Sequence, residues 1–165
     1  MGIYLNPGSD MFQQSLNSMI FVDKSDIIAE LNKIINTNEK YICISRPRRF
    51  GKSMTMNMVS AYYDRTVESS LFARTKISKT DNYAKHRGAY DVLFINMQNF
   101  LSKTKTMEDL LRLLESRVGR ELVYAYPDID FFDKNSLAYL LEDIYSVTKR
   151  NFVIFIVEWD CIFRE

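Results

Sequence analysis

Three consecutive residues, Gly51, Lys52 and Ser53, are of the types that bind phosphate groups in proteins. Glycine lets the backbone approach an anion where a Cβ atom would collide, and lysine adds a positive charge. The serine hydroxyl adds a ligand for Mg²⁺. A helix that begins at these residues also attracts a phosphate through its first amides and its partial positive charge. The triplet therefore predicts a phosphate site.

The preceding residues must place this triplet at the start of a helix. Residues 41–45 (YICIS) are mostly apolar and favour a strand buried on both faces. Pro47 excludes regular structure from the next segment, RPRRF. Strand, tight loop, Gly-Lys-Ser and helix are the layout of a P-loop. Because Arg46 stands where the standard pattern has its first glycine, the triplet alone also fits an alternative, a basic turn before an ordinary helix.

The longer string RPRRFGKS, residues 46–53, resembles the Walker A variant of a bacterial and archaeal family of AAA-ATPase-like proteins. Other segments resemble motifs of this family in the same order. FVDKS (residues 21–25) is similar to its lead-in, YYD (62–64) to the residues after its P-loop helix, and EWDCIFRE (158–165) to its Walker B tail. The resemblance covers the chain from about Phe21 to Glu165.

This resemblance implies a fold class and ligands. The fold class is α/β, a P-loop NTPase-like three-layer α-β-α domain with a parallel sheet. The ligands are ATP and Mg²⁺, with Ser53 as the metal ligand and Lys52 reaching the γ-phosphate. The lead-in implies that Phe21 or Asp23 lies near the base, although an apolar helix start and a helix cap explain these residues equally well. The implied nucleotide-binding residues are Arg48, Arg49, Phe50, Gly51, Lys52, Ser53 and Met54.

In the family, Asp-Glu ends the third strand: the aspartate holds Mg²⁺ through a water, and the glutamate polarises the attacking water. This chain has Val157 and Glu158 at these positions. Valine offers no oxygen, so Glu158 remains as the candidate catalytic residue without the metal-holding partner. Losing one well-placed electrostatic group commonly costs about 3–4 kcal/mol of transition-state stabilisation, roughly two to three powers of ten in rate. We therefore expect ATP binding with weak or absent hydrolysis.

Family members continue with a fourth strand, between the P-loop strand and the Walker B strand, and typically with a PD-(D/E)XK nuclease-like domain. The chain is therefore expected to be the N-terminal portion of a truncated domain, with an incomplete sheet. The nuclease-like domain or another chain would complete that sheet. The expected organisation is an irregular N-terminal arm, residues 1–20, followed by the AAA-ATPase-like domain, residues 21–165.

Apolar spacing predicts the other elements. Helices are expected over residues 25–35, after Ser53, from about 106 until Pro127, and from about 135 to 149. Residues 90–96 and 152–157 predict two more strands, and strands separated by helices indicate a parallel sheet. Residues 64–85 predict turns or short helices. After the P-loop, a stripe at helical spacing is expected in the core: Met54, Met58, Val59 and Tyr62.

Composition limits the cellular setting. The net charge of +1 argues against broad electrostatic binding of nucleic acid. Cys43 and Cys161 do not suggest a disulfide framework, and no apolar run reaches the ~20 residues of a membrane-spanning helix. These features predict a cytoplasmic protein without a membrane partner. His86, the only histidine, stands between lysine and arginine and is expected at the surface.

Two alternatives to ATP binding stay open. One is a non-enzymatic relic or interaction module, whose P-loop persists without a ligand. The other is a nucleic-acid-binding piece, in which Arg46, Arg48, Arg49 and Lys52 contact the phosphate backbone. The predicted strand-loop-helix context favours the nucleotide, because a surface basic patch does not need it.

Overall fold

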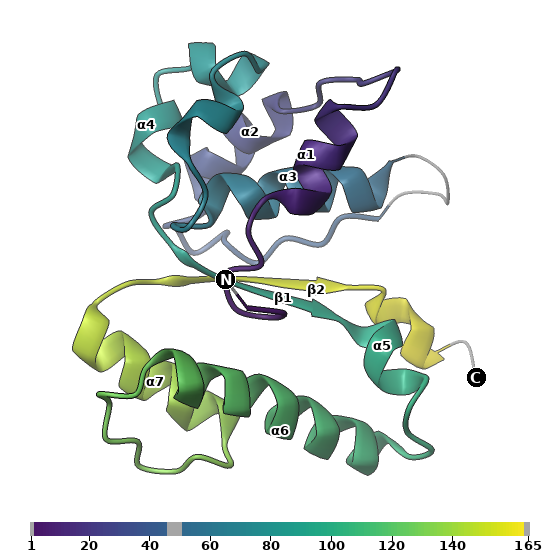
Figure 1. Ribbon diagram of the computed structural model, residues 1–165, viewed down its shortest axis with the longest axis vertical. Coiled ribbons are helices and arrows are strands. Elements are labelled where there is room, and N and C mark those ends of the chain that lie inside the picture. Colours follow the sequence, from purple (N-terminus) through teal and green to yellow (C-terminus); the bar gives the residue numbers. More distant parts are fainter. Residues whose placement is uncertain (1, 46–50, 164–165) are drawn as a thin grey trace. The chain divides into compact units, whose positions relative to one another are not determined.

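A computed structural model describes residues 2–45 and 51–163 (Figure 1). The chain divides into two units. Unit 1 consists of Met1–Pro7 and Asp91–Glu165, and unit 2 consists of Gly8–Tyr90. Helices and a two-stranded parallel sheet are compatible with the predicted α/β class. In the described part of the chain, no helix is both long and apolar enough to cross a bilayer.

The sheet of unit 1 pairs β1 (Asp91–Asn96) with β2 (Phe152–Val157) in parallel. The register joins Asp91 to Phe152 at one end and Asn96 to Val157 at the other. Two apolar runs separated by helices predicted these strands and their direction, and both are confirmed. The sequence EWDCIFRE begins directly after β2, as expected for a motif at a strand end.

The beginning of the chain pairs with β1. Leu5 forms an antiparallel bridge with Leu93, and the Asn6 amide donates to the Val92 carbonyl at 2.7 Å. β1 therefore has hydrogen-bonded neighbours on both sides. This position explains why most of β1 is buried, whereas β2 is largely half-buried or exposed.

Two long helices, α6 (Met107–Ala125) and α7 (Leu137–Thr148), cover one face of this sheet (Figure 1). The hydroxyls of Thr106 and Ser136 cap them, each accepting the backbone amide three residues later at 3.1 and 3.5 Å. Both helices were predicted from apolar spacing and are confirmed. The buried core of unit 1 consists of Leu5, Leu93, Ile95, Met97, Phe100, Leu110, Val118, Leu122, Phe131, Leu140, Ile144 and Cys161.

A shorter helix follows the carboxyl end of each strand. α5 (Met97–Leu101) continues from β1, and the 3-10 helix η3 (Trp159–Phe163) follows β2. These two helices pack against each other.

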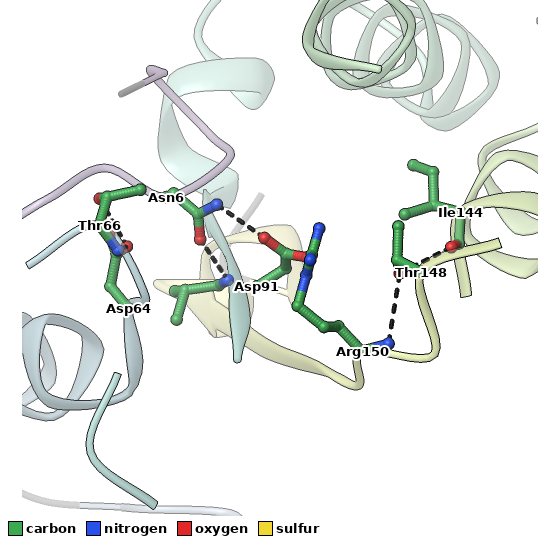
Figure 2. A network of polar contacts seen from close by, with 8 residues as sticks. Asn6, Asp64, Thr66, Asp91, Ile144, Thr148 and Arg150 are labelled. Atoms are coloured by element: carbon green, nitrogen blue, oxygen red, sulfur yellow. Dashed lines mark hydrogen bonds and ion pairs between the residues drawn. The ribbon is translucent and has the colours of Figure 1, made fainter. Parts of the chain in front are cut away.

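A buried carboxylate fixes the amino end of β1 (Figure 2). Asp91 is 0% exposed; its Oδ1 accepts from Asn6 Nδ2 at 2.9 Å and its Oδ2 accepts from Arg150 Nε at 3.0 Å. Asn6 Oδ1 accepts the Val92 amide at 2.7 Å. Asn6 has a φ of 47°, a left-handed conformation that asparagine tolerates better than most residues. The network joins the start of the chain, β1 and the residues before β2.

Unit 2 contains helices and turns. Its elements are α1 (Asp10–Leu16), α2 (Asp26–Ile34), α3 (Lys52–Tyr63), the 3-10 helices η1 (Ser69–Phe72) and η2 (Lys76–Lys79), and α4 (Tyr83–His86) (Figure 1). The predicted helices over α2 and α3, and the predicted short helices or turns over residues 64–85, are confirmed.

The predicted irregular arm, residues 1–20, is wrong where α1 forms. Phe12 of α1 is 1% exposed and stacks on Phe72, with 5.1 Å between ring centroids. This contact comes from a distant part of the chain, so the polar composition of residues 1–18 did not reveal it. The division into an arm and a domain from residue 21 remains a prediction.

α3 supplies much of the core of unit 2. Met58, Val59 and Tyr62 are buried as predicted, and Met54 is half-buried. The Tyr62 hydroxyl donates to the Tyr83 carbonyl at 2.6 Å and accepts from Asn32 Nδ2 at 2.9 Å. The first tyrosine of the YYD motif is therefore part of a satisfied buried network.

The aspartate of the same motif orders the chain after α3. Asp64 is 0% exposed. Its Oδ1 accepts the amide and the hydroxyl of Thr66 at 2.8 and 2.7 Å, as Figure 2 shows, and its Oδ2 accepts the Gly8 amide at 2.8 Å. Backbone ordering explains why an acidic residue stands at this position.

The predicted strand over residues 41–45 is wrong. These residues belong to no helix or strand; Tyr41 is 86% exposed and Ile42 is 46% exposed. A strand persists only where a neighbour takes its backbone hydrogen bonds, and the described sheet does not include this segment. An apolar run shows a preference for extended structure without showing whether a partner is present. The loop that follows, residues 46–50, lies outside the described residues.

His86 is buried, contrary to the predicted surface position. It is 3% exposed, its Nδ1 lies 2.7 Å from Tyr90 Oη, and the two rings stack at 11°. Tyr90 Oη also accepts from Asn36 Nδ2 at 3.4 Å. The charged neighbours Lys85 and Arg87 suggested exposure, but successive side chains on one helical turn point in different directions.

Burial at this position predicts a pH-dependent stability. Burial, and then the charge of Lys85, lowers the pKa of His86 from its usual 6.5. The unfolded chain therefore binds a proton more readily than the folded chain does as the pH falls. We expect the contribution of His86 to the free energy of unfolding to be fully present above about pH 6.5. This contribution should decrease as the pH falls from there towards the lower pKa of His86 in the folded chain.

Urea unfolding from about pH 8 to about pH 5 measures this dependence. His86→Asn, which does not titrate, is expected to show a flatter profile than the parent. Equal slopes for the two chains would show that His86 is not the responsible group.

Candidate functional site

α3 begins at a left-handed glycine. Gly51 has φ 74° and ψ 24°, a conformation that glycine adopts at little cost. Its carbonyl accepts the Thr55 amide at 3.0 Å, which starts the hydrogen bonding of the helix. The next amides, of Lys52, Ser53 and Met54, are those for which a helix provides no carbonyl of its own. Together with the partial positive charge of the helix end, this turn attracts an anion.

Two lysines lie at the turn. Lys52 is the first residue of α3, and Lys24 reaches the turn from the segment before α2. A Cβ atom at Gly51 would lie 3.2 Å from Lys24 Nζ and 3.8 Å from Met54 Cε. The Lys24 ammonium therefore stands next to the turn backbone, and a side chain at position 51 would crowd it. The turn combines helix amides with two positive charges.

Sequence reasoning identified Lys52 but missed Lys24. FVDKS was singled out for its resemblance to a lead-in, and the base was the expected contact of that lead-in. The available signal was the lysine within FVDKS, but only the structure shows that it reaches Gly51.

Hydrogen bonds hold the lead-in segment in place. Asp23 Oδ1 accepts the Ser25 amide and its Oδ2 accepts the Lys76 amide, both at 2.8 Å. The buried Ser25 hydroxyl accepts the Ile77 amide at 3.0 Å. Burial raises the pKa of Asp23, but the hydrogen bonds from Ser25 and Lys76 outweigh it and hold that pKa below its usual value. Asp23 is thus an anchor that positions the adjacent Lys24.

The predicted nucleotide-binding residues fall into two groups. Gly51, Lys52, Ser53 and Met54 lie together at the start of α3, with Ser53 exposed and the others half-buried. Arg48, Arg49 and Phe50 lie outside the described residues.

In unit 1, β2 ends at Val157, opposite Asn96 of β1. Glu158 follows with a φ of 54°, which is uncommon for a residue other than glycine, and its carbonyl accepts the Cys161 amide at 3.2 Å. Asn96 Oδ1 accepts the Gln98 amide at 3.0 Å and caps α5. Val157 thus ends the strand, with Glu158 directly after it, and valine provides no metal ligand. Glu158 belongs to unit 1 and the α3 turn to unit 2.

The α3 turn fits a phosphate group. Its glycine leaves the backbone accessible, and its charged side chains are cationic. Across residues 2–45 and 51–163, no group of three His, Cys, Asp or Glu side chains could hold a metal ion. A magnesium ion at the turn would therefore depend on the Ser53 hydroxyl and on oxygens of the phosphates themselves.

A family model named AAA-ATPase-like, described as predicted AAA-ATPase, matches residues 9–165. No curated protein and no solved structure matches the chain. The matched region includes the start of α3, the lead-in with Lys24, and the end of β2.

Proposed function

The chain belongs to the AAA-ATPase-like family, and from this premise we propose that it binds ATP at the start of α3. The observation that carries the proposal is the left-handed Gly51 with Lys24 Nζ beside it and Lys52 after it. Helix amides and two cations suit the clustered negative charges of a triphosphate. A basic turn that binds no anion would not require a glycine at the position where Lys24 Nζ lies beside the backbone.

Each residue of the turn has a role in this proposal. Amides from Arg48 to Ser53 surround the β-phosphate, and Lys52 reaches the γ-phosphate. Lys24 adds a second charge beside Gly51. Mg²⁺, when bound, neutralises charge on the phosphates, and Ser53 supplies its protein ligand.

The proposed domain is the P-loop NTPase-like α-β-α arrangement over residues 21–165. The parallel sheet of β1 and β2 is compatible with this arrangement. The full arrangement also requires residues 41–45 to join a sheet, and in the structure they do not.

We propose that hydrolysis is slow. Val157 provides no oxygen where the family has its metal-holding aspartate, and Glu158 remains as the proposed base. The protein would then act mainly in its ATP-bound form.

Calorimetric titration of the full chain with ATP tests this proposal, with and without Mg²⁺. Saturable binding that Mg²⁺ strengthens supports it. A folded, monodisperse sample that binds no nucleotide would instead favour the non-enzymatic interaction module. DNA binding with a steep salt dependence, unaffected by competing ATP, would favour the nucleic-acid alternative.

Lys24→Ala is expected to weaken Mg-ATP binding about tenfold, because the turn loses one of its two cations. Titration calorimetry at low and high salt measures the loss, which should shrink as salt screens the charge. Lys33→Ala is the matched control: this exposed lysine of α2 pairs with Glu30 at 2.7 Å. If both variants bound equally well, Lys24 would not contact the phosphates.

A further inference from the structure

A hollow of about 720 Å³ lies at the carboxyl end of α6, within unit 1. Its walls are residues 123–127 together with Ile129, Phe131 and Lys134, which belong to the α6–α7 connection, residues 126–136. This volume is in the range of pockets that take small ligands. The proposed ATP site at the start of α3 belongs to unit 2 and shares no residue with the hollow.

The walls of the hollow are mostly apolar and include aromatic rings. Tyr124 is 88% exposed, whereas Phe131 is 8% exposed and belongs to the core of unit 1. Aromatic rings attract other rings more strongly than their buried area alone predicts. An exposed tyrosine beside apolar walls therefore favours a ligand with an aromatic body.

Lys134 is the one charged residue among the described residues that line the hollow. It is exposed, and in the described part of the chain it forms no ion pair. Asp128, Asp130 and Asp133 belong to the same connection, but none of them lines the hollow. A single cation beside apolar walls matches a ligand with one negative charge, because a ligand with several charges would find only one partner there.

Contacts with both helices hold the connection around Lys134 in place. A Cβ atom at Gly119 of α6 would lie 3.6 Å from the Lys134 carbonyl oxygen, so the helix and this part of the connection approach closely. The Phe132 amide donates to Asp143 Oδ2 of α7 at 2.9 Å. These contacts order the wall before a ligand arrives, which reduces the entropic cost of binding.

We propose that this hollow binds a small aromatic monocarboxylate. The carboxylate of the ligand pairs with the Lys134 ammonium, and its ring packs against Tyr124 and the apolar wall. A neutral aromatic ligand would gain nothing from the ammonium, and a carboxylate without a ring would leave the apolar wall uncovered. Charge and ring together define the class of ligand.

Titration of the ¹⁵N-labelled full chain with 2-naphthoate, followed by heteronuclear NMR, tests this site. Amide signals within residues 123–134 are expected to shift and to saturate. 2-Naphthamide has the same rings without the charge and should bind about threefold more weakly, as expected when an exposed ion pair is lost. Acetate has the charge without the rings and should cause no saturable shift.

Substitutions separate the two contributions. Lys134→Gln should weaken 2-naphthoate binding about threefold and remove its advantage over 2-naphthamide, whereas Lys134→Arg, which keeps the charge, should retain that advantage. Tyr124→Ala should weaken the binding of both ligands to a similar extent. Lys103→Gln is the matched control, because this exposed lysine of unit 1 does not line the hollow. The NMR spectra also show whether each variant is folded.

Four results would overturn the proposal. One is the absence of any saturable shift within residues 123–134. Another is equal affinity of the parent for 2-naphthoate and 2-naphthamide, which would show that the ammonium does not select the ligand. Shifts confined to residues 51–54 would place the carboxylate at the α3 turn instead. Shifts of the hollow's signals that depend on protein concentration, without any ligand, would show that a second copy of the chain covers it.

Discussion

Lys52→Ala is expected to weaken Mg-ATP binding at least about a hundredfold, the largest effect of any single substitution at the α3 turn. Lys52 is the first residue of α3 and is half-buried, so its charge acts where solvent screens it incompletely. The same turn provides the helix amides, which cannot replace a charge that reaches the γ-phosphate.

Two measurements check this expectation. Titration calorimetry gives the affinity directly, and ATP should raise the unfolding temperature of the parent but not of the variant, since only a bound ligand stabilises the folded state. Lys33→Ala again controls for loss of an exposed lysine. Unchanged affinity in Lys52→Ala would refute ATP binding at the start of α3.

Arg150→Met is expected to lower the free energy of unfolding by about 3 kcal/mol. Arg150 Nε donates to Asp91 Oδ2 at 3.0 Å, and Asp91 is 0% exposed. Methionine keeps much of the volume but removes the guanidinium, so the buried Asp91 carboxylate loses its ion pair with Arg150. Urea unfolding measures the loss. Arg112→Met removes a solvent-exposed ion pair from α6 and should cost less than about 1 kcal/mol.

The double variant with Asp91→Asn separates charge from packing. If the cost of Arg150→Met comes from losing the charge pairing with Asp91, neutralising Asp91 should recover part of it, because Asn6 can still donate to the new amide oxygen. A double variant less stable than Arg150→Met would show that the guanidinium stabilises the fold by contacts other than charge pairing.

The local sequence was sufficient to predict those helices and strands whose own residues show a regular apolar pattern. α6 and α7 follow an apolar period with hydroxyl caps at Thr106 and Ser136, and β1 and β2 are continuous apolar runs. A helix beginning at Gly-Lys-Ser was also predicted, and α3 begins at Lys52.

The errors arose where distant residues decide the outcome. Residues 41–45 have the composition of a strand, but a strand also needs a partner, which composition does not specify. The burial of His86 depends on Tyr90, and that of Phe12 on Phe72. Lys24 was missed as a site residue because nothing in its sequence neighbourhood indicates that it reaches Gly51.

The pairing of the first residues with β1 has a consequence for synthesis on the ribosome. Asn6 leaves the ribosome 85 residues before Asp91, whose carboxylate its side chain binds. At typical elongation rates this delay is roughly 4–17 s. All of Gly8–Tyr90 is translated during that interval, so nascent unit 2 is the first to have its complete sequence. We expect pulse proteolysis of stalled nascent chains to find protected unit 2 segments while the amino-terminal residues are still cleavable.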